Sequence, residues 1–210
     1  MTKKRLFVFA VLAIVASSAF ALPDFSISAG IGGLFDIRLS QQIWFEDVEE
    51  SDYAYELRTI NGGGYAFFDA TYVELSIGIS GGRLLQPAEY FGSESSSVNL
   101  NIGVLGKFPF GISERFTLFP LLGFNYSVAL SIKTDGYEDN KPGDFSEFWF
   151  QIGAGMDFSF TSSIYLRFTP LLGSRLPTKF EKDLMYEYDG ETDVVPAVSL
   201  TARLAVGFRF

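Results

Sequence analysis

The sequence predicts an all-β fold, namely an eight-stranded antiparallel up-and-down transmembrane β-barrel. Three observations carry this prediction. Apolar residues alternate with small or polar ones in segment after segment, and the connections between these segments are short and long in turn. After residue 21, no apolar run approaches the ~18 residues that a spanning helix needs. The hydrophobic residues, which make up 48% of the 210-residue chain, are therefore spread along strands.

The first 21 residues have the order of a secretory signal peptide. Basic residues at positions 3–5 precede an apolar run at 6–15, and the small-residue pattern Ala19-Phe20-Ala21 follows. Ten apolar residues at 1.5 Å rise are too short for a bilayer core of about 30 Å. We therefore expect cleavage after Ala21, which divides the chain into a signal peptide at 1–21 and one barrel domain at 22–210.

The first four predicted strands differ in how clearly they alternate. At 25–39 the odd positions are mostly apolar, and the even positions begin with serine and glycine. At 58–68 the alternation is poor around Gly62-Gly63-Gly64, so this strand is assigned from its place in the sequence. At 72–82 and 98–108, Val, Leu and Ile alternate with Glu, Ser, Asn and Gly.

The last four predicted strands alternate throughout. The segment at 116–132 is the longest, with one face of Phe, Leu, Tyr, Val and Ile. At 147–160, Phe, Ile and Met oppose Glu, Trp, Gln, Gly and Asp. At 164–176 and 198–210, arginines fall on the face of small and polar residues.

The connections between the predicted strands alternate in length. Short connections follow the second, fourth and sixth strands, around 69–71, 111–114 and 161–163. Long polar connections follow the first, third, fifth and seventh strands, at about 40–57, 83–97, 133–144 and 177–193. Short turns at one end and long loops at the other are typical of an up-and-down meander.

Alternation alone does not say whether the apolar face points inward or outward. Eight strands enclose an interior just wide enough for side chains to fill. The apolar face is crowded with bulky residues and the opposite face is rich in Gly, Ser, Ala and Asn, so the small residues suit the interior. The strands also match the 9–11 residues that cross a bilayer. We therefore predict a transmembrane barrel, with a secreted lipocalin-like carrier as the alternative.

The last strand resembles the terminal strand of bacterial outer-membrane barrels. It runs Ala202-Arg203-Leu204-Ala205-Val206-Gly207-Phe208-Arg209-Phe210. With the signal peptide and eight strands, nearly the whole chain is similar to the family of small outer-membrane barrels that includes OmpA, OmpX and OmpW-like proteins. The ending Gly207-Phe208-Arg209-Phe210 leans toward OmpW-like members. The resemblance implies residence in the bacterial outer membrane, contact with its lipid, and recognition of Phe208 and Phe210 by the barrel-assembly machinery.

Charged residues on the face assigned to the lumen form the candidate site. They are Glu74, Asp157, Arg167 and Arg203, with Lys107 and Arg209 near the short-turn end. Because buried charges must be paired, we predict an ionic cluster that closes the lower lumen. Four residues are expected to fill the space beside it: Phe119, Leu121, Tyr165 and Leu171. A well-packed cluster makes a plug, whereas a looser one admits small solutes, including hydrophobic ones.

The long loops are strongly acidic, because 18 of the 25 acidic residues fall in them. The first two loops hold Glu46, Asp47, Glu49, Glu50, Asp52, Glu56, Glu89 and Glu94. The last two hold Asp135, Glu138, Asp139, Asp144, Glu181, Asp183, Glu187, Asp189, Glu191 and Asp193. Solvation of the loops is the simpler interpretation. A surface site for a divalent cation or a partner is the alternative, although the spacing is not that of an EF-hand. Trp44 and Phe45 are interfacial aromatics or anchors for such a partner.

Two absences from the composition exclude several classes of function. The chain has no His and no Cys, so it lacks a Ser-His-Asp triad, a thiolate nucleophile and the usual zinc ligands. Among outer-membrane barrels, the palmitoyl transferase, the lipid deacylase, the phospholipase and the omptin proteases all use a catalytic His, so the resemblance does not extend to their mechanisms. The net charge of −9 argues against nucleic acid as a partner. We expect no enzymatic activity, no cofactor and no metal.

The sequence therefore predicts a non-enzymatic integral outer-membrane barrel with acidic surface loops. In this interpretation it is structural, or it passes small solutes. The alternative is a surface adhesin or ligand-binding barrel that acts through its long loops.

Overall fold

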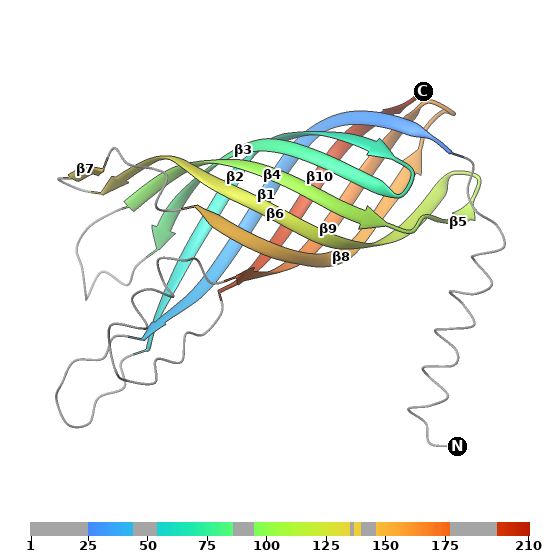
Figure 1. Ribbon diagram of the computed structural model, residues 1–210. Helices are drawn as coiled ribbons and strands as arrows, with labels where there is room; N and C mark the ends of the chain where they lie inside the picture. The colour runs from blue at the N-terminus through green and yellow to red at the C-terminus, as the bar shows by residue number, and fades with distance from the viewer. Residues whose placement is uncertain (1–24, 44–53, 86–94, 135–136, 140–145, 177–196) are drawn as a thin grey trace, which may run out of the picture.

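The chain folds as a barrel of long antiparallel strands (Figure 1). The computed structural model describes residues 25–43, 54–85, 95–134, 137–139, 146–176 and 197–210; the signal peptide predicted at 1–21 lies outside them. The strands are β1 (Ile27–Ile43), β2 (Ala54–Ala70), β3 (Val73–Leu85), β4 (Ser95–Lys107), β5 (Phe110–Ser113), β6 (Phe116–Thr134), β7 (Tyr137–Asp139), β8 (Glu147–Ser159), β9 (Ile164–Leu176) and β10 (Val198–Arg209). None of the described segments is a helix long and apolar enough to cross a membrane.

Eight of these strands close the barrel. In the ring order β1-β2-β3-β4-β6-β8-β9-β10, each strand pairs antiparallel with the next, and β10 returns to β1. The short strands β5 and β7 both pair with β6 and lie at opposite ends of the barrel (Figure 1). The predicted eight-stranded up-and-down barrel is therefore confirmed. Closure leaves no unpaired edge, which is the condition for a sheet surrounded by lipid.

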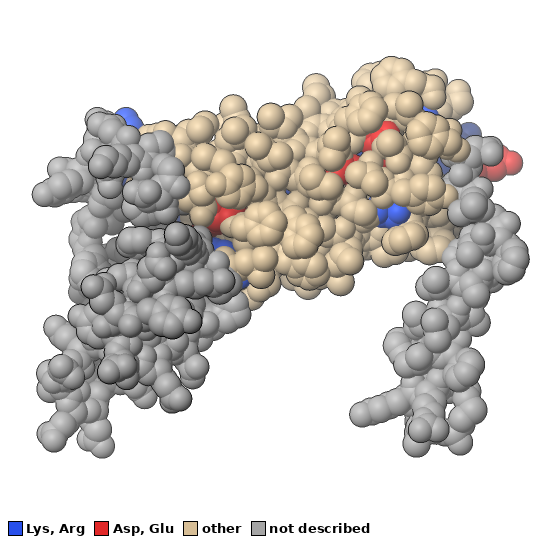
Figure 2. Space-filling view, viewed as in Figure 1, with Lys and Arg blue, Asp and Glu red and all other residues tan. Residues whose placement is uncertain are grey.

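Apolar side chains cover the outside of the barrel. The exposed positions include Ile31, Phe35, Leu75, Ile77, Ile79, Ile102, Leu122, Phe124, Ile152, Leu172, Leu200, Leu204 and Phe208. On the face shown in Figure 2, charged residues form only small patches among uncharged atoms. Small and polar residues point inward, as the volume argument predicted. This arrangement is the inverse of a soluble carrier with an apolar interior.

The second strand is longer than its sequence suggested. The predicted first loop at 40–57 was too long, because β1 continues to Ile43 and β2 begins at Ala54, with Gln41 paired to Glu56. Beyond the apolar outer band of the barrel, strands pair through their backbones and need no alternation of apolar residues. The alternation therefore did not reveal that β1 and β2 extend this far. Glu56 accordingly lies in β2. By the same reasoning Glu138 and Asp139, expected in a loop, lie in β7.

The inward face of β2 is mostly polar or aromatic. Asn61, Tyr65, Phe67 and Asp69 are buried, whereas Phe68 is exposed on the outer face. This register, which the sequence left open, brings two aromatic rings and one carboxylate into the lumen.

The turn between β2 and β3 is fastened to the residue before β1. Thr71 has a φ of 45°, in the left-handed region that β-branched residues rarely adopt. Its hydroxyl accepts a hydrogen bond from Ser26 N at 2.7 Å, and its amide donates to Ser26 O at 3.1 Å. These bonds hold the turn in place, so Asp69 and Glu74 face each other across the two strands.

Inward glycines provide the space for the aromatic rings of the lumen. Each of three rings lies so close to a glycine that an added Cβ would come within 2.5 Å of it. The pairs are Gly30 with Phe67, Gly155 with Phe119 and Gly207 with Tyr165. Small residues on the inner face are therefore what lets an eight-stranded interior hold aromatic side chains.

Candidate functional site in the barrel interior

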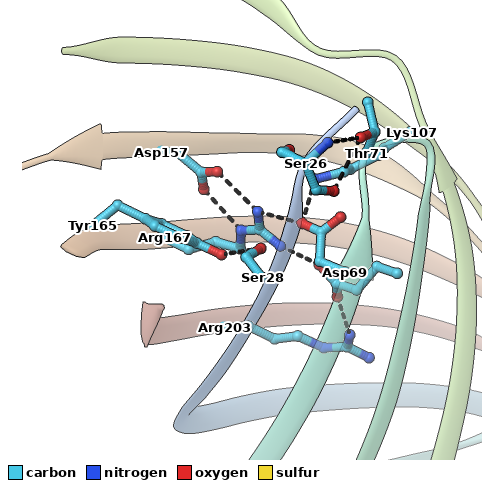
Figure 3. A network of polar contacts seen from close by, with 10 residues as sticks. Ser26, Ser28, Asp69, Thr71, Lys107, Asp157, Tyr165, Arg167 and Arg203 are labelled. Carbon is cyan, nitrogen blue, oxygen red and sulfur yellow. Dashed lines mark hydrogen bonds and ion pairs between the residues drawn. The ribbon is translucent and has the colours of Figure 1, made fainter. Parts of the chain in front are cut away.

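Arg167 of β9 is the centre of a buried cluster of charges (Figure 3). Its guanidinium donates to both carboxylate oxygens of Asp157, from Nε at 2.7 Å and from Nη2 at 2.8 Å. It also donates to Glu74 at 2.6 Å and to Asp69 at 2.7 Å. One guanidinium thus holds three carboxylates, and its side chain is only 1% exposed. The planar fork of arginine suits such multiple, charge-assisted bonding.

Two more cations complete the cluster. Lys107, at the end of β4, forms an ion pair with Asp69. Arg203 of β10 lies further away, with Nη1 at 3.7 Å from Glu74 and at 3.5 Å from the hydroxyl of Ser76. Three cations therefore balance three carboxylates. This balance is what allows so many charges to stay buried. We call Asp69, Glu74, Lys107, Asp157, Arg167 and Arg203 the Arg167 cluster.

Aromatic rings and leucines enclose the cluster. The Arg167 guanidinium carbon lies 4.7 Å from the ring centre of Phe67, 4.9 Å from that of Phe119 and 5.2 Å from that of Tyr165. These distances are within the range of cation–π attraction. Phe119 also packs with Leu105, Leu121 and Leu171, all almost fully buried. The charges therefore sit in a water-poor layer across the lumen.

The structure brings the four predicted residues together inside the barrel. Glu74, Asp157, Arg167 and Arg203 all face the lumen and are all buried, and the residues expected to fill the space beside them do so. Lys107 joins them. Arg209 instead lies outside the cluster, with its guanidinium 5.2 Å from the ring of Tyr165.

Sequence reasoning missed Asp69 as a member of the cluster. It was placed in the turn at 69–71, but β2 runs to Ala70 and Asp69 points inward opposite Glu74. The poor alternation of β2 concealed its register. Asp69 lies on the same face of β2 as Tyr65 and Phe67, but no pattern within the strand marks that face as the inner one.

A second group of charges lies nearer the loop end, and the sequence did not single it out. Arg38 of β1 donates from Nε to Asp36 at 2.6 Å and also pairs with Glu147 of β8. Glu147 accepts a further hydrogen bond from Trp149 Nε1 at 3.2 Å. Asp36 accepts from Thr201 at 2.8 Å. Arg38 lies over the Trp149 ring at 5.0 Å.

Several predictions fall on other parts of the chain. Phe208 and Phe210 are exposed on the outer face at the end where β5 lies; their role in assembly stays a prediction. Trp44, Phe45 and most of the acidic loop residues lie outside the described residues. Within the described part of the chain, no group of three or more Asp or Glu side chains is arranged to hold a metal ion.

Comparison with known proteins shows which fold class the barrel has. No family model matches the chain, and no curated protein matches it. Among solved structures, it is similar to Neisserial surface protein A, with 8% identity, 88% of this chain and 97% of that chain covered, and a TM-score of 0.52. The attachment invasion locus protein Ail of Yersinia pestis, solved with the heparin analogue sucrose octasulfate, is 14% identical, with 90% and 100% covered and a TM-score of 0.43.

A third similar structure is the N-terminal β-barrel domain of OprF from Pseudomonas aeruginosa. It is 13% identical, with 86% of this chain and 99% of that chain covered and a TM-score of 0.40. At 8% identity, the similarity to Neisserial surface protein A shows a shared fold alone. That fold is the one of small eight-stranded outer-membrane barrels. A closer relation to OmpW-like proteins stays a prediction.

Proposed function

We propose that this chain is a non-enzymatic integral protein of the bacterial outer membrane. Its barrel is closed to ions and serves as a membrane-embedded support for its long loops. The apolar outer surface and the closed sheet suit a lipid environment. Outer-membrane lipid and, through Phe208 and Phe210, the barrel-assembly machinery are the partners that this proposal requires.

The Arg167 cluster is the observation that supports a lumen closed to ions. Its members come from β2, β3, β4, β8, β9 and β10, so the cluster reaches across the barrel rather than lining one wall. Arg167, Asp69 and Glu74 have side chains at most 2% exposed. A hydrated ion would have to displace charge-assisted hydrogen bonds in a poorly hydrated layer, which is costly.

The same bonds argue for a function other than catalysis. Glu74 and Asp157 are two of the lumen carboxylates that acid–base chemistry would use. Both are held by Arg167 at 2.6–2.7 Å. A general base needs room for a substrate beside it, and these two carboxylates face a guanidinium instead.

Single-channel recording tests the closed lumen. The protein without residues 1–21, refolded into a planar bilayer, is expected to insert without current steps. The double variant Arg167→Ala/Asp157→Ala removes one charge of each sign, so the remaining charges stay balanced, and it is expected to conduct. Arg115→Ala, at an exposed turn position, is the matched control. Regular current steps from the unmodified protein would overturn the proposal and favour passage of solutes.

A further inference from the structure

A small polar cavity lies in the lumen on the loop side of Arg203. Its walls combine charged, amide and hydroxyl side chains, among them Asp36, Arg38, Asn125, Gln151, Ser199 and Arg203. Its volume is about 20 Å³. One water needs roughly 10–15 Å³ by this measure together with two to four polar partners. The cavity therefore has room for one or two waters.

Three buried polar atoms of the cavity wall lack a partner among the described residues. They are Asn125 Oδ1, Gln151 Oε1 and Arg203 Nε. Each belongs to a side chain that is at most 5% exposed as a residue. Arg203 is also the most loosely bonded member of the Arg167 cluster: its polar contacts are 3.5 and 3.7 Å long, and its guanidinium lies 5.3 Å from the ring centre of Tyr65. Polar groups separated by 3.5 Å or more are commonly bridged by a water molecule that hydrogen-bonds to both.

The two ends of this cavity are closed to different degrees. Toward the short turns lies the Arg167 cluster, whose side chains are 1–6% exposed and in which Arg167 alone makes four hydrogen bonds. Toward the loops lies the pair of Arg38 and Glu147, whose side chains are 14% and 25% exposed. This pair is partly buried, and ion pairs that solvent reaches are weaker than fully buried ones, so it opens more readily than the Arg167 cluster.

We propose that this cavity is a hydrated blind pocket with Arg203 as its floor. It holds one or two water molecules between its polar walls, which include the side chains of Asn125, Gln151 and Arg203. Water-sized solutes reach it from the loop end past the Arg38–Glu147 pair, and the Arg167 cluster stops them there. The inference rests on the closed lumen proposed above and adds to it a direction of access.

Silver ion is a suitable probe, because it is small, reacts with thiols and meets no other thiol in a chain without cysteine. Ser199→Cys places a single thiol in the cavity wall. Ser28→Cys places one beyond the Arg167 layer, where Ser28 bonds to Tyr165. Each variant is folded in detergent, exposed to silver ion, and then denatured and alkylated so that mass spectrometry counts the thiols left free. The folded state is checked by its heat-dependent gel mobility.

Two second-site changes then test the route. Glu147→Ala removes the acceptor of the loop-side pair and is expected to speed silver reaction at Ser199→Cys several-fold, with no change at Ser28→Cys. Glu114→Ala, the same change at an exposed turn carboxylate, is the matched control and should alter neither rate.

Each result decides between the alternatives. If Ser199→Cys stays unreactive in the folded barrel with and without Glu147→Ala, the pocket is dry or sealed and the inference is wrong, while the closed lumen stands. If Glu147→Ala speeds silver reaction at Ser28→Cys as much as at Ser199→Cys, silver ion passes the Arg167 cluster. The proposals of a blind pocket and of a closed lumen are then both wrong.

Discussion

Arg167 and Asp157 face each other directly across β9 and β8, and the guanidinium bonds both oxygens of the carboxylate at 2.7 and 2.8 Å. This fork fixes the plane of the guanidinium. Its remaining donors then point across the lumen to Glu74 and Asp69 on β3 and β2. The pair on one wall therefore orients the bonds that brace the opposite wall, which makes Arg167 a structural centre of the barrel.

Loss of the Arg167 charge should destabilise the barrel strongly. Arg167→Met keeps most of the volume but leaves three carboxylates with too few partners in a buried layer. Breaking a buried ion pair by removing one partner costs about 3–5 kcal/mol. We expect a clearly lower urea midpoint for unfolding from detergent micelles. Arg115→Met at the exposed turn is the control, and an unchanged midpoint for Arg167→Met would contradict the role assigned to the cluster.

Arg203→Met should cost less than Arg167→Met. The polar contacts of Arg203 are 3.7 Å to Glu74 and 3.5 Å to Ser76, whereas Arg167 makes four bonds of 2.6–2.8 Å. Side by side, the two variants should rank in that order by unfolding midpoint. The reverse order would show that Arg203 stabilises the barrel more than its longer contacts indicate.

A methyl group at Gly155 should be poorly tolerated. An added Cβ would lie 2.0 Å from Cε2 of Phe119, whose ring is fully buried and has no room to move away. Overpacking of this kind costs about 1–3 kcal/mol. Gly155→Ala should therefore lower the unfolding midpoint, and Phe119→Leu in the same chain should restore part of it. Gly62→Ala, where no atom lies within 4 Å of the added Cβ, is the matched control and should unfold like the unmodified protein.

Phe210→Ala should affect assembly in cells more than stability. The ring is 82% exposed, so its removal takes away little packing, and the backbone bond from Phe210 N to Ile27 O does not need it. We expect less folded protein in the outer membrane, measured from membrane fractions, with normal refolding into detergent. Phe25→Ala, at a similarly exposed ring, is the control. Equal amounts of both variants in the membrane would argue against a terminal assembly signal.

Alternation predicted most of this fold because each strand has a lipid face and a lumen face of different volume. Bulky residues outside and small ones inside leave a signal of period two that seven strands carry. β2 is the exception, because glycines stand on both of its faces at positions 62–64 and two aromatic rings point inward. Its register follows from backbone pairing to β1 and β3, which a single strand's pattern does not contain.

The candidate site was predictable in part for the same reason. The alternation of apolar and polar positions placed Glu74, Asp157, Arg167 and Arg203 on the inner face. The rule that buried charges are paired then predicted that they form an ionic cluster. Asp69 was lost with the register of β2. The link between Arg38 and Glu147 joins β1 to β8 across the lumen, and no local pattern in the sequence encodes a contact between strands that are not neighbours.

Closure of the barrel depends on its first and last strands, which meet from Ser28 opposite Arg209 to Leu39 opposite Val198. Nearly the whole barrel domain lies between these partners, so this seam is the least local pairing in the chain. Non-local pairings are slow to form because the entropy of a long loop must be lost first. A sheet that lacks β10 has two unpaired edges, which are prone to pair with other chains. Truncation before β10 should therefore yield aggregates instead of a smaller barrel.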